Sequence, residues 1–156
     1  MRRIHRTIDI KAPVGRVWEF LQQPNNLPGV WPHLVAVSNI VPREGGTNDF
    51  DWVFKMGGVH FKGHAFVEQA RPGEYVRFRN EGGIPSTFVW NYQATALGTR
   101  VTVDVEYTIP TPVIGKLAEA LVAKGNERDL DALLQNTKER LEYATTKVPV
   151  TVETSP

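Results

Sequence analysis

The amino-acid sequence predicts an α+β protein in which helices cover one face of a single antiparallel β-sheet. Six consecutive segments between residues 34 and 108 alternate apolar and polar side chains, as half-buried strands do. Short turns of hairpin length separate these segments, so neighbouring strands are expected to run antiparallel. Apolar residues recur at helical spacing on both sides of this region, at 13–22 and at 113–144.

The chain begins with a short strand and a short helix. Residues 4–10 place three isoleucines on one face, which predicts a strand that Ala12-Pro13 ends. Proline suits a first helical position, and the apolar spacing after it predicts a helix over 13–22, carried by Val14, Val17, Trp18 and Leu21. Prolines then interrupt residues 24–33, which we expect to form a loop or a broken short helix.

The six following segments form a meander. Glycine-containing turns separate them, among them Gly57-Gly58 and Gly82-Gly83. The strands are expected at 34–41, 50–56, 59–68, 76–79, 88–94 and 101–108. Because each strand is apolar on one face only, one face of the sheet should be covered and the other wet.

The cover is expected from a long helix over residues 113–144. Its apolar stripe is predicted to begin at Leu117 and Leu121 and to continue through Leu130, Leu133, Leu134 and Leu141. Gly125 lies within this pattern, where glycine is unfavourable, so a kink or a close approach is expected there. We expect one domain over residues 1–145 and a flexible tail over 146–156.

Composition excludes several classes of protein. The 156 residues include no cysteine, which rules out disulfides, thiolate metal sites and cysteine nucleophiles. The 18 basic and 17 acidic residues give a net charge of +1, too little for a nucleic-acid surface. No apolar run is long enough to span a membrane and no signal-peptide pattern is present, so we expect a cytoplasmic protein. The sequence leaves the oligomeric state open.

No motif predicts a metal, a cofactor or a recognisable catalytic constellation. His60 and His64 lie on one strand, about 13 Å apart, too far to share a metal ion. The glycine pairs match no phosphate-binding loop, and no serine lies in a nucleophile elbow. The alternating charges, at Asp49, Asp51, Arg77, Arg79, Asp104 and Glu106, are expected to form ion pairs on the wet face of the sheet.

The aromatic residues are the most informative set. Alternation places eight of them on the covered face: Trp52, Phe54, Phe61, Phe78, Phe88, Trp90, Tyr92 and Tyr107. They could simply form the core, or a subset could line a cavity for an apolar ligand. The hydroxyls of Tyr92 and Tyr107 need partners when buried, so these two residues are candidates for polar contacts that orient a ligand.

The order of elements resembles the START-like superfamily, also called SRPBCC, and more narrowly its polyketide cyclase/dehydrase and lipid-transport branch. The resemblance covers about residues 3–145. It rests on the opening Ile8–Pro13, the run Val17–Leu21, then Pro24 and Trp31-Pro32, the start Gly98–Val101 of the last strand, and the leucine-rich helix. It implies a helix-grip fold, in which a curved antiparallel sheet wraps around a long C-terminal helix with a hydrophobic cavity between them.

The resemblance implies binding or transport of a small hydrophobic ligand, such as a lipid, polyketide or quinone-like molecule. The expected lining is Trp52, Phe54, Met56, Phe61, Phe78, Trp90, Tyr92, Tyr107, Leu117 and Leu121. The expected entrance lies between Pro24–Trp31, the Gly82–Pro85 turn and the first turns of the last helix. One alternative is a polyketide cyclase, aromatase or dehydratase that uses Tyr107 for proton transfer. Another is a protein-interaction module that uses the wet sheet face.

Overall fold

The computed structural model describes the backbone of residues 1–153 and the side chains of residues 1–143. The strands are β1 (Arg2–Ile10), β2 (Leu34–Pro42), β3 (Asn48–Met56), β4 (Val59–Arg71), β5 (Tyr75–Gly82), β6 (Ser86–Ala94) and β7 (Thr99–Tyr107). The α-helices are α1 (Val14–Gln22), α2 (Thr111–Ile114) and α3 (Glu119–Glu153), with 3₁₀ turns at Pro24–Asn26, Glu44–Gly46 and Lys116–Ala118. The predicted α+β class and the predicted meander are confirmed.

All seven strands form one antiparallel sheet in the order β1-β7-β6-β5-β4-β3-β2. The first strand therefore joins the last, and β1 and β2 are the two edges. The β3–β4 hairpin shows how local sequence sets this order. Gly57 and Gly58 have φ values of 58° and 80°, which a two-residue type I′ turn requires and most other residues avoid.

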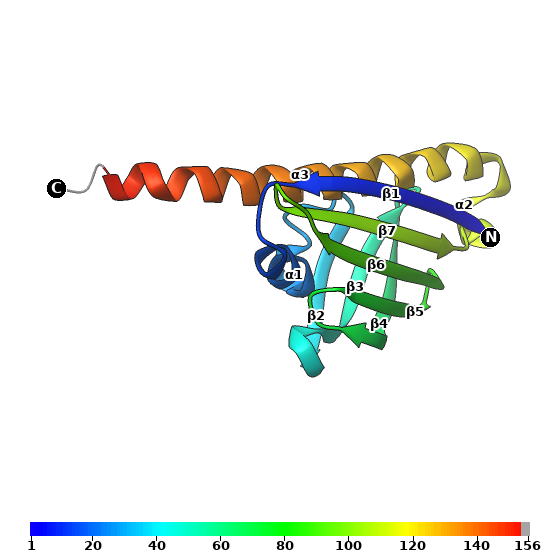
Figure 1. Ribbon diagram of the computed structural model, residues 1–156. Helices are drawn as coiled ribbons and strands as arrows, with labels where there is room; N and C mark the ends of the chain where they lie inside the picture. Colours follow the sequence, from blue (N-terminus) through cyan, green and yellow to red (C-terminus); the bar gives the residue numbers. More distant parts are fainter. Residues whose placement is uncertain (154–156) are drawn as a thin grey trace.

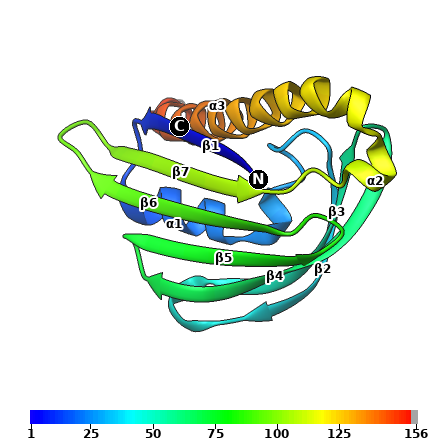
Figure 2. The same cartoon turned by 90° about the vertical axis from the view of Figure 1, so that its right-hand side faces the viewer.

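The sheet is strongly curved, and the helices occupy its concave side. Figure 2 shows β1 and β7 at one side of the curve and β2 and β3 at the other, with α1 inside it. Figure 1 shows α3 running alongside β1. Ion pairs fasten this contact, because Arg6 of β1 lies 2.6 Å from Asp131 and 3.1 Å from Glu127.

Polar contacts also tie α3 to the segment between α1 and β2. The side-chain amide of Asn136 donates a hydrogen bond to the Val30 carbonyl at 2.9 Å. His33 and the buried Asp129 lie 2.8 Å apart, and burial raises the pKa of Asp129. The helix therefore bridges β1 on one side and the 27–33 segment on the other, and it covers the space enclosed by the sheet.

The predicted start of the last helix was wrong. Gly115 has a φ of 97° and separates the short α2 from the 3₁₀ turn that leads into α3. Leu117 is fully exposed and Leu121 is 77% exposed. The physical reason is helical phase: the nine residues from Leu121 to Leu130 span about two and a half turns, which places the two leucines on opposite faces. The buried stripe begins instead at Ala123.

A further expectation for this helix was not met. Helix α3 runs through Gly125 without a break, and a Cβ built there meets no atom within 4 Å, so neither a kink nor a close approach is present. Helix α3 continues to Glu153, and the flexible tail expected over 146–156 stays a prediction. Residues 154–156 lie outside the described part of the chain. Among the described helices, none combines the length and apolar character needed to span a bilayer.

Candidate functional site

A partly open cavity of about 120 Å³ lies between the concave face of the sheet, α1 and α3. Every strand from β3 to β7 contributes to its wall, together with Ile4 of β1, the end of α1, the Pro24–Leu34 segment and α3. The lining is almost entirely apolar and aromatic. Among the residues whose side chains are described, no charged side chain lines this cavity. Such a space favours an uncharged apolar occupant.

Six of the residues expected to line the cavity do so: Trp52, Phe54, Met56, Phe78, Trp90 and Tyr107. The alternation of the strands predicted their facing correctly. The half-buried Trp31 joins them from the segment before β2, and its ring meets those of Phe54 and Phe88 edge-to-face at centroid distances of 5.7 and 5.6 Å. Ile84, from the turn between β5 and β6, also contributes.

Four expected residues lie outside the lining. Leu117 and Leu121 point to the surface: Leu117 lies in the 3₁₀ turn before α3, and Leu121 is out of phase with the buried stripe. Phe61 is buried, but it packs under the β5–β6 turn, where a Cβ added to Gly83 would lie 3.0 Å from its ring. Tyr92 is buried beneath α1, with the ring of Trp18 edge-on at 5.0 Å. These four residues therefore do not belong to the described lining of the cavity.

Four polar residues that the sequence analysis did not single out line the cavity: Gln22, Asn80, Ser86 and Asn126. Two of them had a signal in the sequence. Gln22 lies four residues after Trp18, and Asn126 lies four residues before Leu130, so each falls on the apolar stripe of its helix. A polar residue on an apolar stripe indicates a buried polar group that needs a partner.

The Asn126 amide donates a hydrogen bond to the Tyr107 hydroxyl at 3.0 Å, at one end of the cavity. The same amide nitrogen lies 3.8 Å from the sulfur of Met56. Burial raises the pKa of Tyr107, so its hydroxyl stays protonated at neutral pH. This pair therefore presents a neutral O–H group to the cavity from the junction of β7 and α3.

Gln22 occupies the other end, where its Nε2 donates a hydrogen bond to the Tyr92 hydroxyl at 3.0 Å. Burial raises the pKa of Tyr92 strongly, so this hydroxyl also remains neutral. The Oε1 atom of Gln22 is buried and has no hydrogen-bond partner within the described part of the chain. An acceptor buried in this way destabilises a fold by about 1–3 kcal/mol.

The two polar ends are far apart. Tyr92 pairs with Val101 in the sheet, and Tyr107 lies six residues further along β7. At about 3.3 Å per residue, the two tyrosines are separated by about 20 Å along the strand. The cavity wall on β3 runs over the same distance, from Phe50 to Met56. The site is therefore elongated, with apolar walls and a polar pair at each end.

One wall of the cavity depends on a glycine. The Trp52 indole lies across Gly63 of the neighbouring strand, where an added Cβ would overlap the ring. The indole N–H donates a hydrogen bond to Asn80 Oδ1 at 3.1 Å. The absence of a side chain at Gly63 and this hydrogen bond together fix the orientation of the ring.

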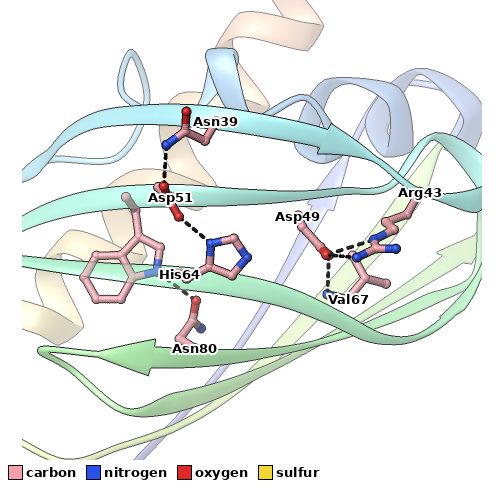
Figure 3. Close-up of polar contacts among 8 residues, drawn as sticks. Asn39, Arg43, Asp49, Asp51, His64, Val67 and Asn80 are labelled. Carbon is pink, nitrogen blue, oxygen red and sulfur yellow. Dashed lines mark hydrogen bonds and ion pairs between the residues drawn. The ribbon is translucent and has the colours of Figure 1, made fainter.

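The charged residues form clusters on the opposite, convex face of the sheet. Figure 3 shows Asp51 between Asn39 and His64, and Asp49 beside Arg43. The expected cross-strand ion pairs are present, including Arg3–Glu106, His5–Asp104 and the pairs of Arg77 and Arg79 with Glu68. Within the described residues, no three histidine or acidic side chains gather as a metal-ligand set.

Asp49 differs from this expectation, because it is buried rather than solvated. Its carboxylate accepts hydrogen bonds from Arg43 at 2.8 and 2.6 Å and from the Val67 backbone N–H at 2.8 Å. The register of β4 against β5 shifts just after Val67, so the carboxylate supports an irregular part of the sheet. Its role is structural.

Comparisons with known proteins fit this geometry. A family model described as polyketide cyclase/dehydrase and lipid transport matches residues 1–142, whereas the comparison with curated proteins finds no match. Among solved structures, the chain is similar to TTHA0849 from Thermus thermophilus, with 26% identity and a TM-score of 0.72, covering 91% of this chain and 97% of that one.

Two more distant structures share the fold. A START superfamily protein from Mycobacterium smegmatis has 13% identity and a TM-score of 0.71, with 91% of this chain and 98% of that one covered. StfQ, a di-domain ARO/CYC from the steffimycin biosynthetic pathway, has 14% identity and a TM-score of 0.70, with 92% and 51% covered. The expected helix-grip fold of the START superfamily is confirmed.

Proposed function

The chain belongs to the polyketide cyclase/dehydrase and lipid transport family, and we propose that it binds a small hydrophobic ligand in the cavity between its sheet and α3. The observation that carries this proposal is a partly open space walled by apolar and aromatic side chains, with a few polar groups at its ends. Burial of apolar ligand surface there contributes about 25 cal/mol per Å² before the cost of ordering the ligand.

The dimensions of the cavity limit the ligand. Its volume of about 120 Å³ is close to that of an engineered cavity of about 150 Å³ that binds benzene. Because the wall extends over about 20 Å of strand, a slim molecule such as an alkyl chain or an alkyl-substituted ring fits better than a round one. A wider ligand requires displacement of a wall residue, and the half-buried Trp31 is the candidate because it lies before β2 and outside the sheet.

A second candidate function is that of a cyclase or dehydratase acting on a polyketide-like substrate in the same cavity. The neutral Tyr107 hydroxyl, oriented by Asn126, supports it, because a positioned O–H can donate a proton to a bound carbonyl or enol. The ARO/CYC description of StfQ belongs to that protein and adds only a reason to test the chemistry. In a carrier, the same hydroxyl would serve to orient the ligand.

The proposal is tested by native mass spectrometry of the freshly purified protein, followed by denaturation and analysis of any released molecule. We expect an adduct of small-molecule mass that dissociates when the protein unfolds. A bare protein mass, together with no binding of alkylphenol or alkane probes in titrations, would contradict the proposed function.

The Tyr107→Phe variant separates the two candidate functions. In a carrier, loss of the hydroxyl should weaken ligand binding by the amount of one hydrogen bond, about 0.5–1.5 kcal/mol, with no chemical change in the ligand. In an enzyme, the variant should lose turnover far more than binding, because the hydroxyl acts in the transition state. Equal loss of turnover and binding would exclude a role for Tyr107 as the proton donor.

A further inference from the structure

The side chain of Gln22 carries a buried oxygen atom that has no hydrogen-bond partner in the described part of the chain. Gln22 is the last residue of α1, is 5% exposed and lines the cavity beside Leu21 and Pro24. Its main-chain carbonyl is occupied by Asn48, whose side-chain amide donates to it at 2.9 Å. Because the side chain is buried, its polar atoms also need hydrogen-bond partners at this end of the cavity.

Only one of the two polar side-chain atoms has a hydrogen-bond partner in the described part of the chain. Nε2 donates a hydrogen bond to the Tyr92 hydroxyl at 3.0 Å. Oε1, on the other side of the amide carbon, has no partner in the described part of the chain. Buried amide oxygens are nearly always hydrogen-bonded in folded proteins, so an unused one in a ligand cavity indicates where a ligand donor belongs.

We propose that Oε1 of Gln22 accepts a hydrogen bond from a hydroxyl group of the ligand, so that the protein selects neutral apolar molecules that carry a hydroxyl at one end. Alkylphenols and long-chain alcohols are of this class. This assignment rests on the proposed function, because it names the chemistry of the ligand in the same cavity.

The absence of charged side chains from the described lining restricts the ligand further. A carboxylate, phosphate or ammonium head group would be buried without a counter-charge, because no charged side chain belongs to the described lining. A carboxylate also offers no hydrogen to Oε1 and would repel it. A neutral hydroxyl meets both conditions, since it donates to Oε1 and carries no charge. The site should therefore reject ionised fatty acids in favour of the corresponding alcohols.

Three probes of similar size test this assignment by titration calorimetry at neutral pH: 4-butylphenol, its methyl ether 4-butylanisole, and 4-butylbenzoate. The ether removes only the donor hydrogen, and the benzoate introduces a negative charge. We expect the unchanged protein to bind the phenol about tenfold more tightly than the ether, as one hydrogen bond to a buried acceptor allows. Binding of the benzoate should be the weakest of the three.

The Gln22→Met variant keeps the length of the side chain and removes its polar atoms. It should bind the ether as the unchanged protein does and lose the preference for the phenol. Gln135→Met is the matched control, because Gln135 is exposed on α3 far from the lining, and it should keep the tenfold preference. Melting temperatures of both variants show whether they fold. Should Gln22→Met fail to fold, the comparison of phenol with ether on the unchanged protein still decides the question.

The outcomes distinguish failure of the Gln22 assignment from failure of the proposed ligand-binding function. Equal binding of phenol and ether by the unchanged protein overturns the assignment and leaves the ligand cavity intact. A preference for phenol that persists in Gln22→Met places the acceptor elsewhere and also overturns it. Tighter binding of the benzoate overturns the preference for neutral ligands. If none of the three probes binds, the assignment fails, and the proposed function fails with it only when native mass spectrometry also shows a bare protein mass.

Discussion

Replacement of Ala65 by leucine is the most direct test of whether the cavity is the binding site. Ala65 lies in β4, is 2% exposed and lines the cavity. In the sheet it is paired with Phe50 on one side and Asn80 on the other, and both of these residues also line the cavity. The three carbon atoms that leucine adds should therefore enter the space that a ligand would use.

The expected effect on stability follows from the volume. An empty cavity lowers the free energy of unfolding by about 24 cal/mol per Å³, so a cavity of about 120 Å³ represents about 3 kcal/mol. A leucine side chain fills part of it, and cavity-filling substitutions commonly add about 0.5–2 kcal/mol. For a chain of this size, that gain corresponds to a rise in melting temperature of about 1–8 °C.

The effect on binding should be opposite to the effect on stability. The assay is thermal and urea unfolding with and without 4-butylphenol. At a ligand concentration of about 100 times Kd, the unchanged protein should gain about 2.7 kcal/mol. Ala65→Leu should gain much less, because its side chain occupies the ligand position. Ala70→Leu is the matched control, since Ala70 lies exposed on the same strand, and it should keep the full gain from the ligand.

Two results would refute this reasoning. If Ala65→Leu lowers the melting temperature and still gains full stabilisation from the probe, the side chain is overpacked and the ligand binds elsewhere. If Ala65→Leu and Ala70→Leu respond alike to the probe, the cavity beside Ala65 is not the site. A more stable Ala65 variant that no longer responds to the probe supports the site at this position.

Two further predictions concern the walls of the sheet. Gly63→Ala should lower the free energy of unfolding by about 1–3 kcal/mol, because the added Cβ displaces the Trp52 ring, and an unchanged near-UV circular dichroism spectrum and melting temperature would contradict this. Hydrogen bonds from Asn39 and His64 hold the pKa of Asp51 below its usual 3.8. The stability that this contributes is present above pH 3.8 and is lost as the pH falls through the lowered pKa. Lowering the pH from about 5 to about 2 should therefore reduce the free energy of unfolding of Asp51→Asn less than that of the unchanged protein, as measured by urea unfolding. Parallel losses in the two proteins would show that the carboxylate is not stabilised.

The sheet could be predicted from the sequence because its signals are local. Alternation of period two sets the facing of every second residue, and a glycine pair such as Gly57-Gly58 fixes the turn between two strands. For this reason Trp52, Phe54 and Trp90 were placed on the concave face correctly. Alternation also separated the charged residues onto the convex face. It could not show that Asp49 is covered, because that depends on Arg43 and the shift in β4.

The helical part of the site could not be predicted in the same way. A stripe of leucines defines a helical face only if the helix is continuous and if the leucines are spaced by whole numbers of helical turns. The interruption at Gly115 and the half-turn between Leu121 and Leu130 break both conditions, so Leu117 and Leu121 were assigned to the wrong face. The polar residues Gln22 and Asn126 were missed for a related reason. Their positions on apolar stripes carry meaning only once the packing partners of each helix are known.

Specific contacts hold part of the cavity wall in place. Eight of the described lining residues carry aromatic rings, and two of these rings are held by specific contacts: Trp52 by the hydrogen bond to Asn80, and Trp31 by two edge-to-face contacts. The side chain at the centre of the sheet, Ala65, is too short to fill the space they leave. For a ligand bound in the cavity as proposed, a wall formed in this way beforehand means that little binding energy is lost in ordering the protein. The stability lost to the cavity in the empty protein is thus returned when an apolar ligand enters, which is the physical basis for expecting ligand binding and thermal stability to rise together.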